Sequence, residues 1–200
     1  MHPPDTALDG RDRILHSTVT LLIERGLGAI DADAICAVAD LERPEFDRWF
    51  DSLESIYVAI TARLLDSHVA NPAGPVRVAG CLDAALRTSL HAVWDMIEQR
   101  IDEHHALHVL LLGQVGDPGL LSRMGFSLHA THLRIAEQWL GGVEHSHGIE
   151  WAVPVPRLAV LVQATLDGLM VDYVARRDGT QIREVLDIFA GHLAANALLT

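Results

Sequence analysis

Histidine is the residue type through which this chain could do most chemistry, since twelve of its 200 residues are histidines. His104, His105 and His108 stand close together, and His129 and His132 form a second group. Neutral imidazoles can bind a transition metal, or can hydrogen-bond an organic ligand that carries hydroxyl or carboxylate groups. The alternative is that these histidines are exposed, or are hydrogen-bonded within a protein core.

Both groups of histidines fall in segments whose apolar residues recur at helical spacing. His105 and His108 share one helical stripe with Ile101 and Leu112. In the second segment, the stripe of His129 also contains Phe126, Leu133 and Leu140. We therefore expect His105, His108 and His129 to face the protein interior.

No catalytic signature accompanies the histidines. Glu103 precedes all three histidines of its group, so the H-E-x-x-H zinc motif is absent. The sequence also lacks Gly-x-Ser-x-Gly, a phosphate-binding loop and a dinucleotide fingerprint. Cys36 and Cys81 are too isolated for a disulfide framework or a zinc knuckle, and the apolar neighbours of Cys36 predict a buried thiol. We predict no catalytic residues and no cofactor, and the sequence does not identify an enzyme.

The composition predicts an all-α protein with a substantial core. Half of the residues are hydrophobic, few are aromatic, and strand-like alternation is nearly absent. The formal net charge of −12 disfavours nonspecific contact with nucleic acid or anionic membranes. Residues 1–10 do not form a signal peptide, and no uninterrupted apolar run reaches the length of a membrane span. We expect a cytoplasmic protein without a membrane partner.

Proline and glycine divide the chain into three predicted parts. Residues 1–9 form a disordered leader, 10–70 a small head with a linking helix, and 71–200 a larger body that begins at the clear break of 71–75. In the head, a helix over 10–25 should end at Gly26. The helices predicted in the body span about 76–97, 101–112, 120–140, 156–177 and 181–198, with a glycine- and histidine-rich loop over 141–156.

The head contains a helix-turn-helix pattern over residues 30–50. A short apolar helix with Ile35 and Ala39 is followed by a polar break, and then by a second short helix with Phe46 and Phe50. Asp31 or Asp33 can cap the first of these helices, and Pro44 suits the first turn of the second.

This region resembles the N-terminal domain of the TetR (tetracycline-repressor-like) family. The resemblance covers roughly residues 10–60 by motif, and it aligns without a gap through Glu24-Arg25-Gly26, Ile35, Ala39, Phe50-Asp51-Ser52 and Ile56. It implies about nine helices, with a DNA-binding head and a body for ligand binding and dimerisation. Arg43, Arg48 and Trp49 are the implied DNA contacts.

The sequence departs from the family pattern where family members contact DNA. Asp40 replaces the turn glycine and Glu42 the turn serine or threonine, while Asp47 replaces a tyrosine and Leu53 a lysine. Residues 1–65 contain six basic and twelve acidic residues, so the head itself is acidic. The packing residues are therefore retained better than the DNA-contacting surface.

The resemblance also implies roles for the body. Helices five to eight of TetR-like proteins enclose a ligand cavity, and its expected lining here is Trp94, His105, His108, Phe126 and His129. The last two helices are strongly apolar, and they resemble the pair through which TetR-like subunits form a homodimer. We thus expect a small-molecule-responsive transcriptional regulator with operator DNA as partner. The alternative is a protein of this fold that has lost DNA binding and acts as a ligand-binding protein or an unusual, metal-dependent enzyme.

Overall fold

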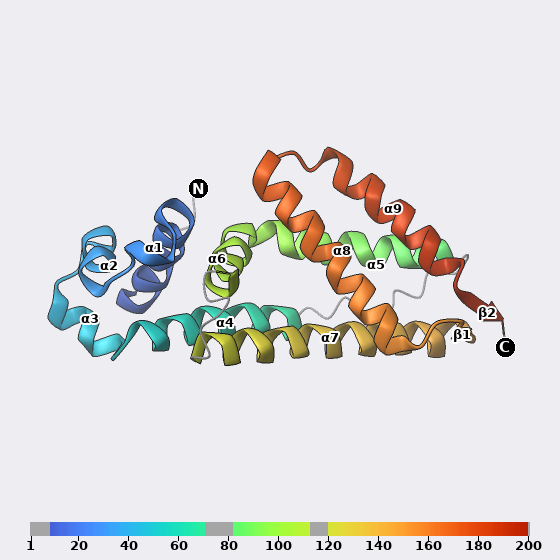
Figure 1. The fold of residues 1–200 in the computed structure, drawn as a ribbon, viewed down its shortest axis with the longest axis horizontal. Helices are drawn as coiled ribbons and strands as arrows, with labels where there is room; N and C mark the ends of the chain where they lie inside the picture. Colours follow the sequence, from blue (N-terminus) through green and yellow to red (C-terminus); the bar gives the residue numbers. More distant parts are fainter. Residues whose placement is uncertain (1–8, 71–81, 113–119, 200) are drawn as a thin grey trace, which may run out of the picture. The chain divides into compact units, whose positions relative to one another are not determined.

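The structure, a computed structural model, describes residues 9–70, 82–112 and 120–199 (Figure 1). Within these ranges the chain forms nine α-helices, one short 3-10 helix (η1, Leu27–Ala29) and one pair of strands. The helices are α1 Gly10–Arg25, α2 Ala32–Ala39, α3 Arg43–Trp49, α4 Leu53–Ala70, α5 Leu82–Gln99, α6 Ile101–Leu112, α7 Leu120–His147, α8 Val155–Arg176 and α9 Thr180–Ala194. The prediction of an all-α fold with a helix-turn-helix head is confirmed.

The chain divides into two compact units, one made of residues 1–69 and 102–125 and the other of 70–101 and 126–200. The first unit holds α1 to α4 and nearly all of α6. The second holds α5, most of α7, α8, α9 and the strands. Hence α6 belongs to the unit of the head, although the sequence places it in the body. The predicted leader and the predicted start of helix five at residue 76 lie outside the described residues.

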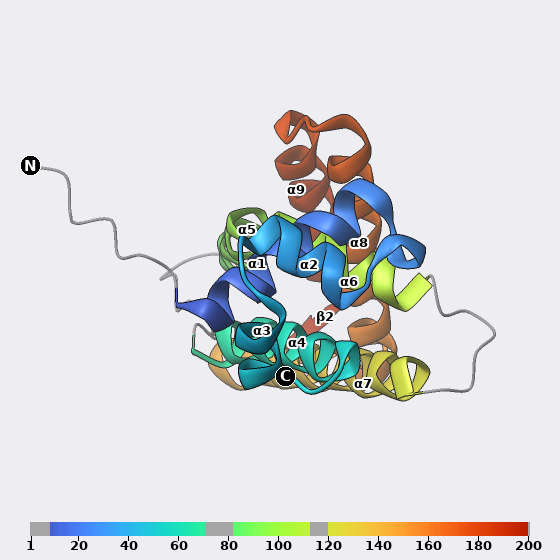
Figure 2. The ribbon, with the colours of Figure 1, turned by 90° about the vertical axis from the view of Figure 1, so that its left-hand side faces the viewer.

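The first unit is built on the packing of α1 against α2 and α3, which form one group in Figures 1 and 2. Apolar side chains from every helix of the head are buried in this core, namely Ile14, Leu15, Leu21, Leu22, Ile35, Ala39, Phe46, Phe50, Ile56, Ile60 and Leu64. This apolar burial stabilises the head, because the short α2 and α3 would be marginal in isolation.

Side chains cap the helices of the head. Asp9 accepts a hydrogen bond from the backbone N–H of Asp12 at the start of α1, and Asp31 accepts one from Ala34 at the start of α2. Pro44 occupies the first turn of α3. The two caps satisfy backbone donors that the helices themselves leave unpaired, which explains why α1 and α2 begin where they do, and Pro44 has no N–H that would need a partner.

The turn between α2 and α3 depends on Asp40 and Arg13. Asp40 has a φ of 52°, in the left-handed region that glycine adopts most readily and aspartate better than most other residues. Arg13 donates from Nη2 to the backbone oxygen of Asp40 at 2.6 Å and also to that of Ala39. The guanidinium thereby satisfies carbonyls at the end of α2 and ties the turn to α1.

In the second unit, α5 packs against α9 around an apolar core. Leu86, Leu90 and Trp94 of α5 are buried in this core, together with Leu186 and Leu193 of α9. Polar contacts flank it: Arg183 forms an ion pair with Asp95 at 2.6 Å, Arg87 forms one with Asp187 at 3.4 Å, and His91 Nε2 lies 3.1 Å from Asp187 Oδ1. Pairs this exposed contribute little individually, so apolar burial holds the two helices together.

The predicted loop over 141–156 is wrong, because α7 continues through Gly141 and Gly142 to His147. Glycine within a helix costs about 1 kcal/mol relative to alanine, and burial of Leu140 and Val143 on both sides of the pair offsets that cost. The helix ends one glycine later, at Gly148, whose φ is 61°. His145 and His147 therefore lie in the last turns of α7.

Two short strands also replace predicted loop and helix. β1 (Ile149–Trp151) pairs antiparallel with β2 (Ala197–Leu199), so α9 ends at Ala194 and does not reach Leu198 as predicted. A strand of three residues is too short for alternation to show in the sequence. The pair forms because Ile149 and Trp151 are buried in the core of the second unit.

The helix α8 is apolar on its exposed side as well. By length and composition it is apolar enough to cross a membrane, the single such helix in the part of the chain that the structure describes. Little of the helix is buried within this chain, so its apolar surface needs another explanation.

Replacing Arg13 by alanine should destabilise the head. The substitution removes charge-assisted hydrogen bonds to Ala39 and Asp40, and we expect a loss of about 1–2 kcal/mol in the free energy of unfolding. Urea denaturation followed by circular dichroism measures it. Arg25→Ala on the same helix is the matched control, since Arg25 is exposed and pairs with none of the described residues. Equal midpoints for the two variants would contradict the capping role of Arg13.

Candidate functional site

The exposed face of α3 is the candidate nucleic-acid interface. Phe46 anchors the helix in the core, and this places Arg43, Asp47, Arg48 and Trp49 on the outside. All three predicted contacts, Arg43, Arg48 and Trp49, are thus exposed on one short helix. The placement is a direct result of helical spacing around one buried aromatic residue.

Arg43 is engaged by carboxylates of the head itself. Its Nε donates to Asp47 Oδ1 at 2.9 Å, and its Nη1 lies 3.3 Å from Asp33 Oδ1. The hydrogen bond to Asp47 and the negative charge of that carboxylate raise the pKa of Arg43. The guanidinium also lies over the Phe46 ring, 5.5 Å from its centroid. A phosphate that approached Arg43 would have to compete with two carboxylates already in place.

Arg48 and Trp49 are placed differently. Arg48 is exposed and forms no ion pair with any residue in the described ranges, so its charge is available to an outside partner. Trp49 lies against the start of α1, where a Cβ atom on Gly10 would stand only 2.6 Å from its indole Nε1. Its side chain therefore packs on α1 as well as facing solvent. Of the three predicted contacts, Arg48 alone combines positive charge with freedom to bind.

Several acidic residues of the head have a structural explanation. Glu42 and Glu45 lie at the N-terminal end of α3, and Asp31 and Asp33 hold the same place on α2. Carboxylates are favourable there because they face the positive end of the helix dipole. They nevertheless make the candidate interface negative. The pairing of Asp47 with Arg43 follows from their i, i+4 spacing, whereas the approach of Asp33 to Arg43 needs the fold, because the two residues lie on different helices.

Cys36 is buried beneath this surface, as the sequence predicts. Burial raises the pKa of its thiol, and the charge of Arg43 opposes that shift without cancelling it. A buried thiol with a raised pKa is a poor nucleophile, since the reactive species is the thiolate. Cys36 therefore acts as a packing residue. Cys81 lies outside the described residues.

The five residues predicted to line a ligand cavity are divided between the two units. Trp94 is buried in the second unit, with its ring edge-to-face against Tyr173 at 5.7 Å. His105 and His108 are half-buried on α6 of the first unit. His129 is exposed, so the inward placement predicted for it is wrong, and the side chain of Phe126 lies outside the described residues.

The buried face of α6 is shifted from the predicted stripe. His104 is buried, together with Ala106, Leu107 and Leu110, whereas His105 and His108 lie at the border of that face. The Nδ1 atom of His108 lies 2.9 Å from the backbone oxygen of His104, one turn earlier. The predicted stripe differs from the buried face because α6 is apolar on most sides, so periodicity marks its inner face poorly. In the described ranges, no three histidine, cysteine or carboxylate side chains group so as to hold a metal ion.

Comparison with known proteins shows the fold. No protein-family model matches the chain, and no curated protein matches its sequence. Among solved structures, Salmonella enterica GusR superimposes with a TM-score of 0.73 over 97% of this chain and 100% of its own, at 19% identity. A transcriptional regulator from Rhodococcus sp. Rha1 gives 0.72 over 95% and 98%, at 18% identity.

A further Rhodococcus protein, assigned to the TetR family of transcriptional regulators, gives a TM-score of 0.71 over 94% of this chain and 100% of its own, at 16% identity. This chain has the TetR fold. The resemblance found in residues 10–60 therefore extends, as a fold, over nearly the whole chain. At these identities the superpositions carry no information on DNA sequence or ligand.

Cys36 should react slowly with a thiol reagent while the protein is folded. In a Cys81→Ser variant, which leaves Cys36 as the single thiol, labelling by Ellman's reagent at pH 8 should proceed at least tenfold more slowly in buffer than in denaturant, because burial hinders access and raises the pKa of the thiol. Absorbance of the released thiolate measures the rate. Equal rates in the two conditions would show that Cys36 is accessible.

Proposed function

We propose that the chain is a dimeric, small-molecule-responsive transcriptional regulator that contacts DNA through α3. The observation that carries the proposal is the fold shared over nearly the full length with solved transcriptional regulators. An exposed α3 that presents Arg43, Arg48 and Trp49 supports it. In DNA-binding proteins, the second helix of a helix-turn-helix enters the major groove, and α3 has that place in the motif here.

Electrostatic attraction to phosphate contributes little to the proposed contact with operator DNA. Phosphate neutralisation by arginine and lysine supplies most of the nonspecific affinity for DNA. Here Arg43 is paired with Asp33 and Asp47, so Arg48 is the main free cation of α3. Asp47 could accept a hydrogen bond from a cytosine amino group and so contribute to base recognition. This surface is therefore better suited to recognising bases than to attracting a duplex nonspecifically through its phosphates.

A second candidate function follows from the same ion pairs. If Asp33 and Asp47 neutralise Arg43 permanently, the head no longer binds DNA and the protein acts through its body alone. Such a protein would be a ligand-binding protein or an enzyme of the TetR fold. The Asp33–Arg43–Asp47 contact is the specific observation that favours this alternative.

The proposed dimer forms through α8 and α9. Val160, Leu161 and Val171 of α8 are each about half exposed, and Ile188 of α9 is 61% exposed. Ala164 and Gly168 share the exposed face of α8, and a Cβ atom on Gly168 would meet nothing within 4 Å in this chain. Such a surface is costly in water, and a second copy would cover it at a gain of roughly 25 cal/mol per Å² buried. Contact with a second copy of the chain also explains why α8 is so apolar.

The proposed effector-binding residues remain the predicted ones, with His105 and His108 in the first unit and Trp94, Phe126 and His129 in the second. The half-buried imidazoles of His105 and His108 can donate or accept hydrogen bonds to a polar group of a ligand. An exposed His129 is a weaker member of the set than the sequence indicates. The effector is a small organic molecule, and operator DNA is the second partner.

A salt series of DNA-binding titrations tests the function. A selected operator duplex and a random duplex are titrated by fluorescence anisotropy, and each phosphate contact contributes about −0.9 to the slope of log K against log salt. We expect specific but weak binding with a shallow slope. The double variant Asp33→Asn, Asp47→Asn releases Arg43, so binding to the random duplex should strengthen at low salt and the slope should steepen by roughly one contact.

The matched control is Glu24→Gln with Glu150→Gln, which changes the net charge equally at exposed residues that do not pair with Arg43. The control should bind the random duplex like the wild type. Equal strengthening in both double variants would show that only net charge matters. Failure of the wild type and of the Asp33, Asp47 variant to bind any duplex at low salt would support the second candidate function.

Dimerisation should be sensitive to charge on the exposed face of α8. The wild type should scatter light as about twice the 21.9 kDa chain mass at micromolar concentration. Leu161→Arg should give a monomer, because an unpaired buried charge costs several kcal/mol. Val58→Arg is the control, since Val58 is an exposed valine of α4 that the proposed interface does not include. A monomeric wild type would refute the dimer.

A further inference from the structure

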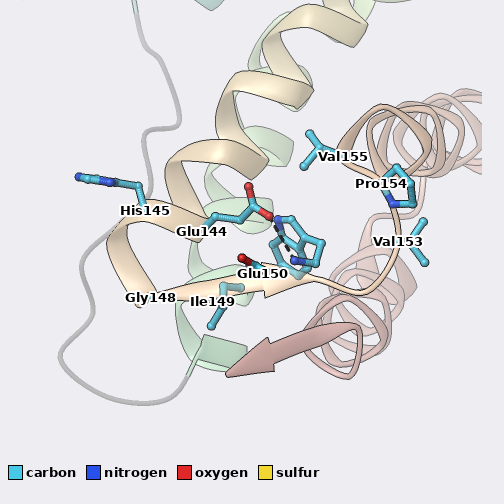
Figure 3. Close-up of a pocket in the computed structure, with 9 residues that line it drawn as sticks. Glu144, His145, Gly148, Ile149, Glu150, Val153, Pro154 and Val155 are labelled. Carbon is cyan, nitrogen blue, oxygen red and sulfur yellow. Dashed lines mark hydrogen bonds between the residues drawn. The ribbon is translucent and has the colours of Figure 1, made fainter. Parts of the chain in front are cut away.

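A hollow in the second unit lies at the end of α7, beside β1 and the start of α8 (Figure 3). Its volume is about 510 Å³, which is within the range of small-molecule sites in proteins. Its lining residues all lie between Glu144 in the last turn of α7 and Val155 at the start of α8, and none of the predicted ligand-binding residues belongs to it. It is therefore a separate feature from the proposed effector-binding residues.

One side of the hollow is apolar. Ile149 and Trp151 are buried in the core, and Val153 and Val155 are half-buried on either side of Pro154. Figure 3 shows Val153, Pro154 and Val155 together along the turn into α8. An apolar surface of this kind favours alkyl groups over water.

The polar side of the hollow carries negative charge. Glu144 Oε1 accepts a hydrogen bond from the backbone N–H of Trp151 at 3.1 Å, and this bond fixes the carboxylate at the hollow. Trp151 is held in turn by its indole N–H, which donates to the backbone oxygen of Leu140 at 3.2 Å. Glu150 is exposed and has no ion pair with a described residue. The lining contains no arginine, and the ring of His145 points away from the other labelled residues in Figure 3.

We propose that this hollow binds a quaternary or alkylated ammonium compound. The positive charge of such a ligand is attracted by Glu144 and Glu150, and its alkyl groups cover the apolar side formed by Val153, Pro154 and Val155. Carboxylate and phosphate ligands are excluded, because both charged side chains of the lining are negative.

The proposal does not rest on DNA binding or on dimerisation. All of the lining residues belong to the second unit and to one chain, so the site is complete without a partner. A regulator could use such a site to sense a cationic effector, and a ligand-binding protein could use it directly.

Choline chloride is the probe, and the purified full chain is the sample. Its neutral carbon isostere, dimethylbutanol, has nearly the same shape without the charge. Binding is followed by NMR through the indole N–H signal of Trp151, which is assigned with a Trp151→Phe variant. We expect a saturable shift with choline and a markedly weaker response to dimethylbutanol.

Two substitutions at the exposed Glu150 test the charge in steps. Glu150→Gln should weaken choline binding about threefold to fivefold, the effect of one solvent-exposed charge pair, and Glu150→Arg should weaken it further. Glu24→Gln is the matched control, and it should bind choline like the wild type. A shift that does not saturate, an equal response to dimethylbutanol, or unchanged affinity in both Glu150 variants would overturn the proposal.

Discussion

The packing of α2 and α3 on α1 is the constraint on which the head depends. Each of the two short helices has too few residues to be stable alone, so burial of Ile35 and Phe46 against α1 has to hold them. The chain turns between them at Asp40, which adopts a left-handed conformation. Arg13 secures that residue by binding the last carbonyls of α2. The position of every exposed side chain on α3 follows from this arrangement.

The electrostatics of the head follow from the same geometry. Fixing α3 beside α2 brings Asp33 within reach of Arg43, so a cation placed for contact with DNA is neutralised from within the protein. The acidic residues at the helix starts stabilise α2 and α3 while they weaken attraction to phosphate. Stability of the scaffold and affinity for nucleic acid are therefore opposed in this head. Base-specific contacts by Arg48 and Asp47 depend less on attraction to phosphate, so the acidic helix starts weaken them less.

The second unit has an apolar core of helices and, beside the end of α7, a short pair of strands. Its core is the apolar contact between α5 and α9, flanked by exposed ion pairs. At its end, the β1–β2 pair closes the unit, and the side chain of Glu144 binds the outer backbone N–H of Trp151. A carboxylate in that position protects the strand edge from pairing with another chain. It also leaves the hollow beside it negative.

The sequence by itself determined the all-α fold, the helix-turn-helix, and the bounds of α1 and α6, because helical periodicity, the Asp31 cap, Pro44 and Gly26 are local signals. It also determined that Cys36 is buried. The sequence did not determine the end of α7, since Gly141 and Gly142 signal a stop that burial of Leu140 and Val143 overrides.

Other features were decided only by tertiary structure. The strands β1 and β2 form across nearly fifty residues of intervening chain, and the pairing of Asp33 with Arg43 joins two different helices. The inner face of α6 and the exposure of His129 depend on which neighbours cover each helix, which periodicity alone does not encode when a helix is apolar on most sides. Local signals fix where helices such as α1 and α6 begin and end. Contacts between distant segments decide which face is buried and which charges are already paired.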